Sequence, residues 1–372
     1  MAQKHTLQIL LSPLLLPLSW IFGFIARARY FLYQKQICPS YSPQIPCICV
    51  GNISWGGTGK SPFIDYLLKL FHTQTVHCAV LSRGYGTKLA SYPFVLNKNI
   101  VDTDRSLKDM ALPDEPCMLL QKNPMSTIVI DPKRAESAKL VEKQFPRIQV
   151  LLMDDGFQHF ALKRHMDFVL LDADDLSPHA GFVKRNWNSL IPLGSWREPE
   201  KALYRAAAFF LKCPPAQWEQ IKEHTVKKLT PYQKPLFVFQ LAITKIIPLF
   251  AQEKNSVHDL KKSDYAILAG IGNPLQFQAG VQEYIGHACA KKFFLADHAN
   301  MDRRLAEILQ LDMPLLCTEK DAVKLQNYPQ LAQKEIYYTQ TAVQFYTSCF
   351  TTDDFETWFR HSVLPLVSNH TK

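Results

Sequence analysis

Residues 50–62 read VGNISWGGTGKSP, and this stretch decides the fold. It follows a short apolar run, IPCICV, and precedes a helical pattern that begins near the final proline, a residue suited to the first turn of a helix. Gly56, Gly57 and Gly59 allow backbone N–H groups to turn inward around phosphate oxygens, at the positive end of the helix dipole. A strand, a glycine-rich loop and a helix in this order predict an α/β fold of the P-loop NTPase type.

The loop departs from the strict pattern G-x-x-x-x-G-K-[ST] at one position, because its first glycine falls on Ser54. The GGTGKS core and its context outweigh this departure, and we expect the loop to bind ATP. Lys60 is expected to contact the β- and γ-phosphates, and the Ser61 hydroxyl to bind Mg²⁺. The predicted nucleotide contacts are Ser54, Trp55, Gly56, Gly57, Thr58, Gly59, Lys60 and Ser61.

A pair of carboxylates supports phosphoryl chemistry. The apolar run IQVLLM at 148–153 ends in Asp154 and Asp155. P-loop enzymes complete the coordination of Mg²⁺ with a carboxylate at the end of a neighbouring strand, so we assign both residues to the metal without choosing which is the direct ligand. Adjacent carboxylates at a strand end also cap helices or lie in solvated turns, but a P-loop in the same chain favours the metal.

The rest of the chain repeats one pattern: short aliphatic or β-branched runs alternate with helical stretches. This predicts a mostly parallel sheet with helices on both faces. A chain of 372 residues exceeds the size at which a single core usually stops growing. We expect a hydrophobic helix at 1–30, a P-loop kinase domain at 31–235, and a second, smaller α/β lobe at 236–372 that closes over the active-site cleft.

The N-terminus is predicted to be a membrane-associated helix. Residues 7–26 read LQILLSPLLLPLSWIFGFIA, barely long enough to span a bilayer, and Pro13 and Pro17 are expected to kink or break the helix. Arg27 and Arg29 follow this run. A secretory signal peptide would need small residues there for cleavage, so these arginines argue against one. In a membrane-associated helix they would instead contact acidic lipid headgroups. A buried helix is the alternative, and whether the segment spans the bilayer or lies in the interface stays open.

Charge and cysteine usage narrow the class of partner. Lys and Arg exceed Asp and Glu by 42 − 33 = 9, which suits an anionic partner such as phosphates, nucleic acid or an acidic lipid surface. No basic stripe interleaved with stacking aromatics stands out, so nucleic-acid binding is not predicted. The nine cysteines form no C-x-x-C pair and no Cys/His cluster at zinc-ligand spacing, which indicates reduced, buried thiols.

Eight motifs, two of which are the phosphate loop and the stretch from Asp154, occur in one order along the chain. They are Gly51-Asn52 with Gly56–Pro62, Ser82–Gly86, Asp114-Glu115-Pro116, Asp154–His159, Pro192-Leu193-Gly194 with Arg197-Glu198-Pro199, Gly270–Pro274, Asp297-His298 and Thr318–Lys324. Together they cover most of the chain, and the sequence resembles the tetraacyldisaccharide 4'-kinases of lipid A biosynthesis. The N-terminal hydrophobic helix also resembles the membrane anchor of that family.

The resemblance implies a reaction, a substrate and a location. ATP, with Mg²⁺, would donate its γ-phosphate to the 4'-hydroxyl of a tetraacyldisaccharide 1-phosphate, giving lipid IVA at the cytoplasmic face of the bacterial inner membrane. The implied partners are this lipid A precursor and the anionic membrane surface, with no nucleic acid and no protein partner. Three departures from the family pattern are Pro113 in place of a glycine, Ala299 in place of a second histidine, and a turn before Arg197 that Ser195 and Trp196 lengthen.

Roles for individual residues follow from the chemistry and the resemblance together. Asp114 is the candidate general base, because a sugar hydroxyl needs a proton acceptor as transfer proceeds, although a solvent-facing turn is the alternative. His298 is expected to orient Asp114. Arg83 and Arg197 are candidates for holding phosphate, with surface salt bridges as the alternative. Gln158 and His159 are candidates for contacts to nucleotide or acceptor.

Two stretches carry a structural interpretation beside the functional one. Thr318, followed three residues later by Asp321, matches a helix N-cap, and Gly270 matches a tight turn after a strand. Arg134 is expected to lie in the solvated first turn of a helix.

Two other classes of protein remain open from the sequence. A P-loop GTPase or metallochaperone predicts a preference for GTP and clusters of metal ligands. A membrane-anchored nucleotide-dependent scaffold predicts nucleotide binding without phosphorylation of an acceptor.

Overall fold

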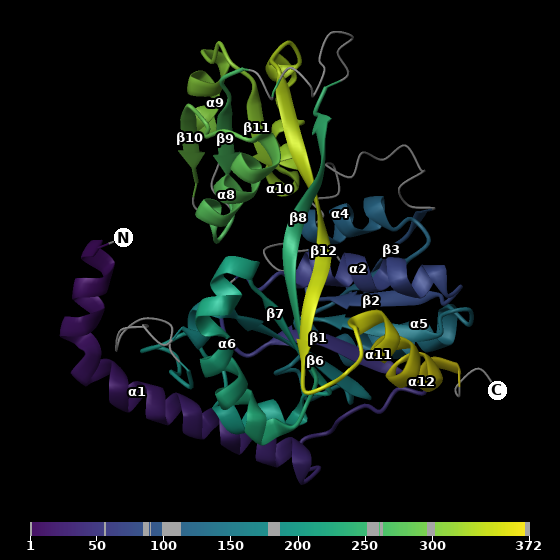
Figure 1. Cartoon of the computed structure of the whole chain (residues 1–372). Helices are drawn as coiled ribbons and strands as arrows, with labels where there is room; N and C mark the ends of the chain where they lie inside the picture. Colours follow the sequence, from purple (N-terminus) through teal and green to yellow (C-terminus); the bar gives the residue numbers. More distant parts are fainter. Residues whose placement is uncertain are drawn as a thin grey trace. The chain divides into compact units, whose positions relative to one another are not determined.

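The computed structural model describes residues 2–55, 57–84, 89, 91–98, 113–177, 187–250, 260, 263–295 and 302–368. The chain divides into two compact units (Figure 1). The first comprises Met1–Gln240 and Gln344–Lys372, and the second comprises Leu241–Val343. The sequence predicted a second lobe that extends to the C-terminus, whereas the last segment of the chain returns to the first unit.

The first unit is built on a mostly parallel sheet with the order β8-β7-β6-β1-β5-β2-β4-β3. Within this order, as far as the structure describes it, β3 runs antiparallel to its neighbour β4, and the other neighbouring strands pair in parallel. The strands are β1 Cys47–Asn52, β2 Cys78–Ser82, β3 Phe94–Leu96, β4 Thr127–Ile130, β5 Val150–Asp154, β6 Met166–Asp172, β7 Ala208–Lys212 and β8 Leu236–Pro248.

Helices cover both faces of this sheet, which is why the central strands are apolar without alternation (Figure 1). On one face, Phe63 of α2 lies 4.5 Å from Phe210 of β7 between ring centroids, and Phe355 of α11 lies 5.3 Å from the same ring. On the other face, side chains of α5 and α6 join the core around Phe209. The helices are α2 Lys60–Thr73, α4 Asp114–Lys122, α5 Arg134–Gln144, α6 Pro215–Leu229, α11 Phe355–Ser362 and α12 Leu364–Ser368, with 3₁₀ turns η1 Ala173–Leu176, η2 Glu200–Arg205 and η3 Thr230–Tyr232.

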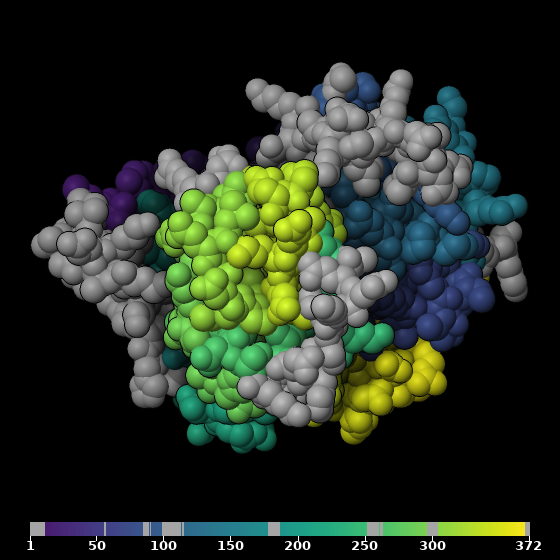
Figure 2. Space-filling view, turned by 90° about the horizontal axis from the view of Figure 1, so that it is seen from above, coloured from purple at the N-terminus to yellow at the C-terminus, as the bar shows by residue number. Residues whose placement is uncertain are grey.

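The second unit is a smaller α/β layer with its own core. Its parallel strands take the order β10-β9-β11-β12, and buried side chains pack on both faces. Figure 2 shows one face of this unit, coloured green to yellow. The elements are β9 Ala266–Ala269, α8 Pro274–Ile285, β10 Lys291–Phe294, α9 Asp302–Leu309, β11 Leu315–Thr318, α10 Glu319–Leu325, η4 Pro329–Leu331 and β12 Ile336–Cys349. The predicted fold class, a mostly parallel P-loop-type sheet with a second α/β unit, is confirmed.

Two long strands carry the chain between the units. β8 begins in the first unit and ends in the second, and β12 returns. The hydroxyl of Thr244 on β8 donates to the carbonyl oxygen of Gln340 on β12 at 3.2 Å. This return explains why the C-terminal helices belong to the first unit.

The N-terminal helix, α1 Ala2–Gln34, belongs to the first unit. It continues through Pro13 and Pro17, and it changes direction along its length (Figure 1), as expected where proline removes a backbone donor. Its section Ser12–Gln34, 23 residues that contain an 18-residue window with a mean hydropathy of 1.2, is long and apolar enough to cross a membrane by length and composition alone. The prolines therefore bend this helix without breaking it.

Candidate active site

The loop between β1 and α2 has the backbone that a phosphate loop needs. Gly59, the N-cap of α2, has a φ of 85°, a left-handed conformation in which a side chain would be strained. Ser54, which stands at the position of the first glycine of the motif, is fully buried and forms an antiparallel bridge with Trp196. Its φ is not positive, so this position does not require glycine.

The segment before Arg197 holds this loop in place. The backbone N–H of Trp55 donates to the carbonyl oxygen of Ser195 at 2.8 Å, and the N–H of Arg197 donates to that of Ile53 at 2.7 Å. The turn that contains Ser195 and Trp196 therefore contacts the loop directly.

Asp155 brings two cations together beside the loop. Its carboxylate lies 3.6 Å from Lys60 Nζ and accepts two hydrogen bonds from the guanidinium of Arg197, at 2.9 and 3.1 Å. Arg197 also donates to the backbone oxygen of Asn52 at 3.0 Å and to its side-chain oxygen. Burial opposes ionisation of Asp155, but Arg197 and Lys60 outweigh it and lower the pKa of this carboxyl to about 2. Asp155 is therefore ionised at neutral pH.

The pKa of Asp154, the last residue of β5, is shifted in the opposite direction from that of Asp155. Burial is the largest cause that raises its pKa, to about 7, and the negative charges of Asp155 and Glu115 add to it, while Lys60 opposes them. Glu115 lies in the first turn of α4, so the start of that helix lies close enough to the end of β5 for their charges to interact. Two adjacent carboxyls thus differ in charge near neutral pH.

Gln158 and His159 follow the same strand. Gln158 Nε2 donates to the backbone oxygen of Asn52 at 3.0 Å, which ties this turn to the end of β1. Burial, followed by the charges of nearby arginines, lowers the pKa of His159 to about 4, so its imidazole is neutral at pH 7. His159 Nε2 is buried and has no hydrogen-bond partner within the described part of the chain. A neutral imidazole in this position is suited to bind a ligand atom.

The arginines of the site differ in exposure. Arg83 is exposed and follows β2 directly. Arg134, at the start of α5, is only 4% exposed, and its guanidinium donates to Pro132 O at 3.2 Å and to Asp154 O at 3.5 Å. The prediction that Arg134 lies in a solvated first turn is wrong, because the turn packs against the end of β5. Burial is the main cause that lowers the pKa of Arg134; the charge of Arg83 adds to it, while Asp154 and Asp155 oppose it.

The described residues contain no cluster of three or more His, Cys, Asp or Glu side chains that could hold a metal ion alone. Asp154 and Asp155 are adjacent, and Ser61 lies in the first turn of α2. Mg²⁺ in phosphoryl-transfer sites is bound by one or two carboxylates and completed by substrate phosphates and water. The donor set here fits an ion that arrives with a nucleotide.

Comparison with known proteins identifies the family. The sequence model of the tetraacyldisaccharide-1-P 4'-kinase family matches residues 11–363. The chain belongs to this family.

Individual members of the family match over nearly the same span. The tetraacyldisaccharide 4'-kinase of Nitratidesulfovibrio vulgaris is 34% identical over 326 residues, which cover 87% of each protein. That of Francisella tularensis subsp. novicida is 32% identical over 323 residues, which cover 86% of this chain and 91% of the relative. The crystal structure of LpxK from Aquifex aeolicus in complex with ATP matches 98% of this chain and 100% of that chain, with a TM-score of 0.68 and 24% identity. The two proteins share a fold.

Within this tetraacyldisaccharide-1-P 4'-kinase, the structure brings several of the predicted residues together. Lys60, Asp155 and Arg197 form one network, and Gln158 joins it through Asn52. Gly56 and His298 lie outside the described residues, as does the side chain of Asp114, whose backbone begins α4. Their proposed roles stay predictions.

Two residues that hold the phosphate loop had no role assigned from the sequence: Lys212, which was not singled out, and Asn52, which was named only as part of a motif. Lys212 Nζ donates to the backbone oxygen of Gly57 at 2.5 Å, and its Cδ lies 3.2 Å from the position that a Cβ on Gly59 would take. Asn52 Nδ2 donates to Thr58 Oγ1 at 3.2 Å. For Lys212, the only signal in the sequence was a lysine at the end of the apolar run AFFLK. That signal points to the phosphate loop only once the order of the strands in the sheet is known.

Proposed function

We propose that this chain is an ATP-dependent kinase that transfers the γ-phosphate of ATP to the 4'-hydroxyl of a tetraacyldisaccharide 1-phosphate, forming lipid IVA. The observation that carries the proposal is its membership of the tetraacyldisaccharide-1-P 4'-kinase family over residues 11–363. Neither a preference for GTP nor a scaffold role has an observation of its own in its favour.

The start of α2 fits the phosphates of a nucleotide. Its N-cap makes no side-chain hydrogen bond, and its first turn contains no acidic residue, so its backbone donors face no competing group of that kind. Lys60 begins the helix, and the amine of Lys212 lies beside the loop. We assign nucleotide binding to the residues from Ser54 to Ser61, with Arg83, Gln158 and His159 as tentative substrate contacts.

The metal assignment rests on Ser61, Asp154 and Asp155. When bound, Mg²⁺ neutralises charge that develops on the β- and γ-phosphate oxygens. Asp155 is ionised at neutral pH and is already oriented by Arg197. Asp154 has a pKa of about 7, so part of the population carries a proton on this carboxyl in the physiological range.

Proton transfer is assigned to Asp114. As the acceptor oxygen forms its bond to the γ-phosphorus and the bond from phosphorus to the ADP oxygen breaks, the hydroxyl proton passes to this carboxylate. His298 is proposed to orient Asp114, and Arg197 to stabilise the transferring phosphate. Support for these roles comes from the motif positions and, for Arg197, from its contacts to Asp155 and Asn52.

We also propose that the protein works at the cytoplasmic face of the bacterial inner membrane. The apolar section of α1 and the net charge of +9 support an acidic lipid surface as its partner.

The test is a transfer assay in detergent micelles. Purified protein with radiolabelled ATP, Mg²⁺ and a tetraacyldisaccharide 1-phosphate is expected to label the lipid at its 4' position. Asp114→Asn is expected to bind nucleotide normally and to lose turnover by about 10²–10⁴-fold. Nucleotide binding without labelled lipid would support the scaffold alternative, and a strong preference for GTP would support the GTPase.

A further inference from the structure

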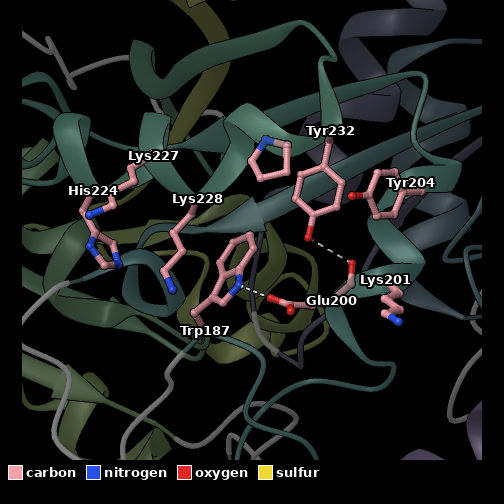
Figure 3. Close-up of a pocket in the computed structure, with 9 residues that line it drawn as sticks. Trp187, Glu200, Lys201, Tyr204, His224, Lys227, Lys228 and Tyr232 are labelled. Carbon is pink, nitrogen blue, oxygen red and sulfur yellow. Dashed lines mark hydrogen bonds between the residues drawn. The ribbon is translucent and has the colours of Figure 1, made fainter.

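A pocket in the first unit is lined by residues that the proposed reaction does not use. It has a volume of about 460 Å³ and is formed by α6, η2, η3 and the segment at Trp187 (Figure 3). The residues that carry the argument are Trp187, Lys201, Tyr204, Lys227, Lys228 and Tyr232.

Its aromatic walls are fixed by contacts. Trp187 packs edge-on against the buried Trp196 at 4.8 Å between ring centroids, and its indole N–H donates to the carboxylate of Glu200 at 2.6 Å. The hydroxyl of Tyr232 donates to the backbone oxygen of Glu200 at 3.2 Å, and the rings of Tyr232 and Tyr204 are 4.7 Å apart. Figure 3 shows these groups around one space. The pocket is therefore shaped before any ligand binds.

The pocket carries excess positive charge. Lys201, Lys227 and Lys228 contribute three cations, and the carboxylate of Glu200 contributes the only anion among the lining residues that the structure describes. That carboxylate already accepts the indole N–H of Trp187. Burial, followed by the charges of Lys228 and Lys227, lowers the pKa of His224, which favours the neutral imidazole at pH 7. Lysine ammonium groups beside aromatic faces fit an anionic headgroup of the phosphate type.

Both sides of the pocket are continuous with segments that contact α1. Three residues after Trp187, the backbone oxygen of Leu190 accepts a hydrogen bond from Ser19 Oγ at 3.1 Å. One residue after Tyr204, the guanidinium of Arg205 lies 4.9 Å from the ring centroid of Tyr30. Because Ser19 and Tyr30 are eleven residues apart, close to three helical turns, they lie on the same face of α1.

The opposite face of α1 is apolar and exposed. Leu14, Leu18, Ile21 and Ile25 are 69%, 51%, 56% and 58% exposed, respectively. Their spacing of i, i+4, i+7 and i+11 places them in one stripe, roughly 100–160° around the helix from Ser19. Such a stripe is suited to enter the boundary between headgroups and acyl chains. The pocket thus flanks a helix whose outward face fits a bilayer.

We propose that this pocket binds the phosphate headgroup of an anionic membrane phospholipid and holds the first unit at the membrane beside α1. The inference rests on the proposed function only for placing α1 at a membrane, and it assigns the pocket no part in the transfer reaction. Any lysine near an anionic membrane adds to its electrostatic attraction for the protein. The test therefore has to distinguish binding by the pocket from the attraction that surface lysines provide.

The experiment compares two pairs of substitutions with equal loss of charge. Lys227→Gln/Lys228→Gln removes two pocket amines, and Lys222→Gln/Lys143→Gln removes two exposed amines outside the pocket. Binding is measured by flotation with phosphatidylcholine vesicles, with and without phosphatidylglycerol. The pocket pair is expected to lose about tenfold or more of the preference for phosphatidylglycerol, and the control pair less than about threefold. Equal losses, or no loss in the pocket pair, would overturn the proposal.

Two further measurements assign the source of the phosphate. Calorimetry with glycerol 1-phosphate is expected to show far weaker binding than the vesicles do, and equally tight binding would assign the pocket to a soluble phosphate instead. In micelles, the pocket pair is expected to keep the wild-type kcat and the wild-type KM for the lipid acceptor. A raised acceptor KM would place the pocket in the substrate site and overturn the proposal. Failure of wild-type protein to phosphorylate the acceptor would contradict the proposed function and leave the vesicle result standing.

Discussion

Two helices of this protein, α2 and α10, each follow a parallel strand, but they differ in whether a side chain caps their first turn. At α10, Thr318 Oγ1 accepts the N–H of Asp321 at 3.2 Å, and the carboxylate of Asp321 accepts the Thr318 hydroxyl at 2.6 Å and the Gly270 N–H at 2.9 Å. At α2, Gly59 caps the helix without any side-chain hydrogen bond. Side chains of the protein therefore cap the first turn of α10, whereas no side chain caps the first turn of α2.

The difference separates a structural motif from a ligand site. Both stretches stand among the motifs that resemble the family, and both combine a strand end, a lysine and nearby carboxylates. Asp321 is fully buried and bonded to protein groups, which supports the structural interpretation of Thr318 and Gly270. Substitutions at α10 should therefore change stability, and substitutions at α2 should change turnover.

The largest expected effect comes from Lys60→Met. This change removes the amine that begins α2 and that lies 3.6 Å from Asp155, and we expect turnover to fall by roughly 10²–10³-fold or more. The free energy of unfolding should change by less than about 1 kcal/mol, because the Lys60–Asp155 pair is partly exposed and Arg197 still donates to that carboxylate. The matched control is Lys320→Met in α10, for which turnover should stay within about twofold. An equal loss in both variants would remove the distinction between the two helix starts.

The second effect is on stability, at Asp321→Ala. Removing a fully buried carboxylate leaves the Gly270 N–H and the Thr318 hydroxyl without that partner, which we expect to cost about 3 kcal/mol of unfolding free energy. Thr318→Ser keeps a capping hydroxyl and should cost less than about 1 kcal/mol. Urea unfolding of both variants measures this. Normal stability with lost turnover in Asp321→Ala would show that α10 binds a ligand.

A smaller effect concerns pH and His159. Its pKa is about 4 in the folded protein and about 6.5 in an unfolded chain, so the unfolded state binds the extra proton between these values. The free energy of unfolding should therefore fall as pH is lowered from about 6.5 to about 4, by about 3 kcal/mol at the lower end. The causes, after burial, are Arg134, Arg164, Arg29 and Arg83, a positive field suited to an anionic ligand.

His159→Gln should remove this part of the pH dependence. Unfolding in urea at a series of pH values, wild type minus variant, isolates the contribution of this one side chain. Parallel curves would mean that His159 is protonated alike in both states. Such a result would weaken the inference that the α2 end of the sheet carries a positive field.

The sequence predicted the features that depend on local pattern. The strand-loop-helix around Lys60, the strand that ends in Asp154, and the cap at Thr318 are all signalled within a few residues. Burial and contacts across the sheet were not accessible, because strand order depends on the whole fold. Arg134 was assigned to solvent for this reason, although its turn packs against the end of β5.

The C-terminal segment shows the same limit at the level of domains. Nothing in the residues after β12 indicates that they return to the first unit, where Phe355 packs against Phe210 of β7. An aromatic helix of this kind fits either unit equally well by composition. The long strand β12 returns the chain to the first unit, and this determines that the C-terminal helices pack there.

The smallest expected effect is that of Lys212→Met on the binding of ATP by the loop before α2. Its amine donates to Gly57 O at 2.5 Å from β7, which β6 separates from β1 in the sheet, so it positions the loop backbone. Losing one such hydrogen bond in Lys212→Met should cost about 1 kcal/mol, which corresponds to a rise of about fivefold in KM for ATP with kcat within about twofold. Lys292→Met, on an exposed site of β10, is the control and should change neither constant. An unchanged KM with a large fall in kcat would mean that Lys212 contacts the transferring phosphate itself, because a residue that only positions the loop acts on nucleotide binding in the ground state and transition state alike.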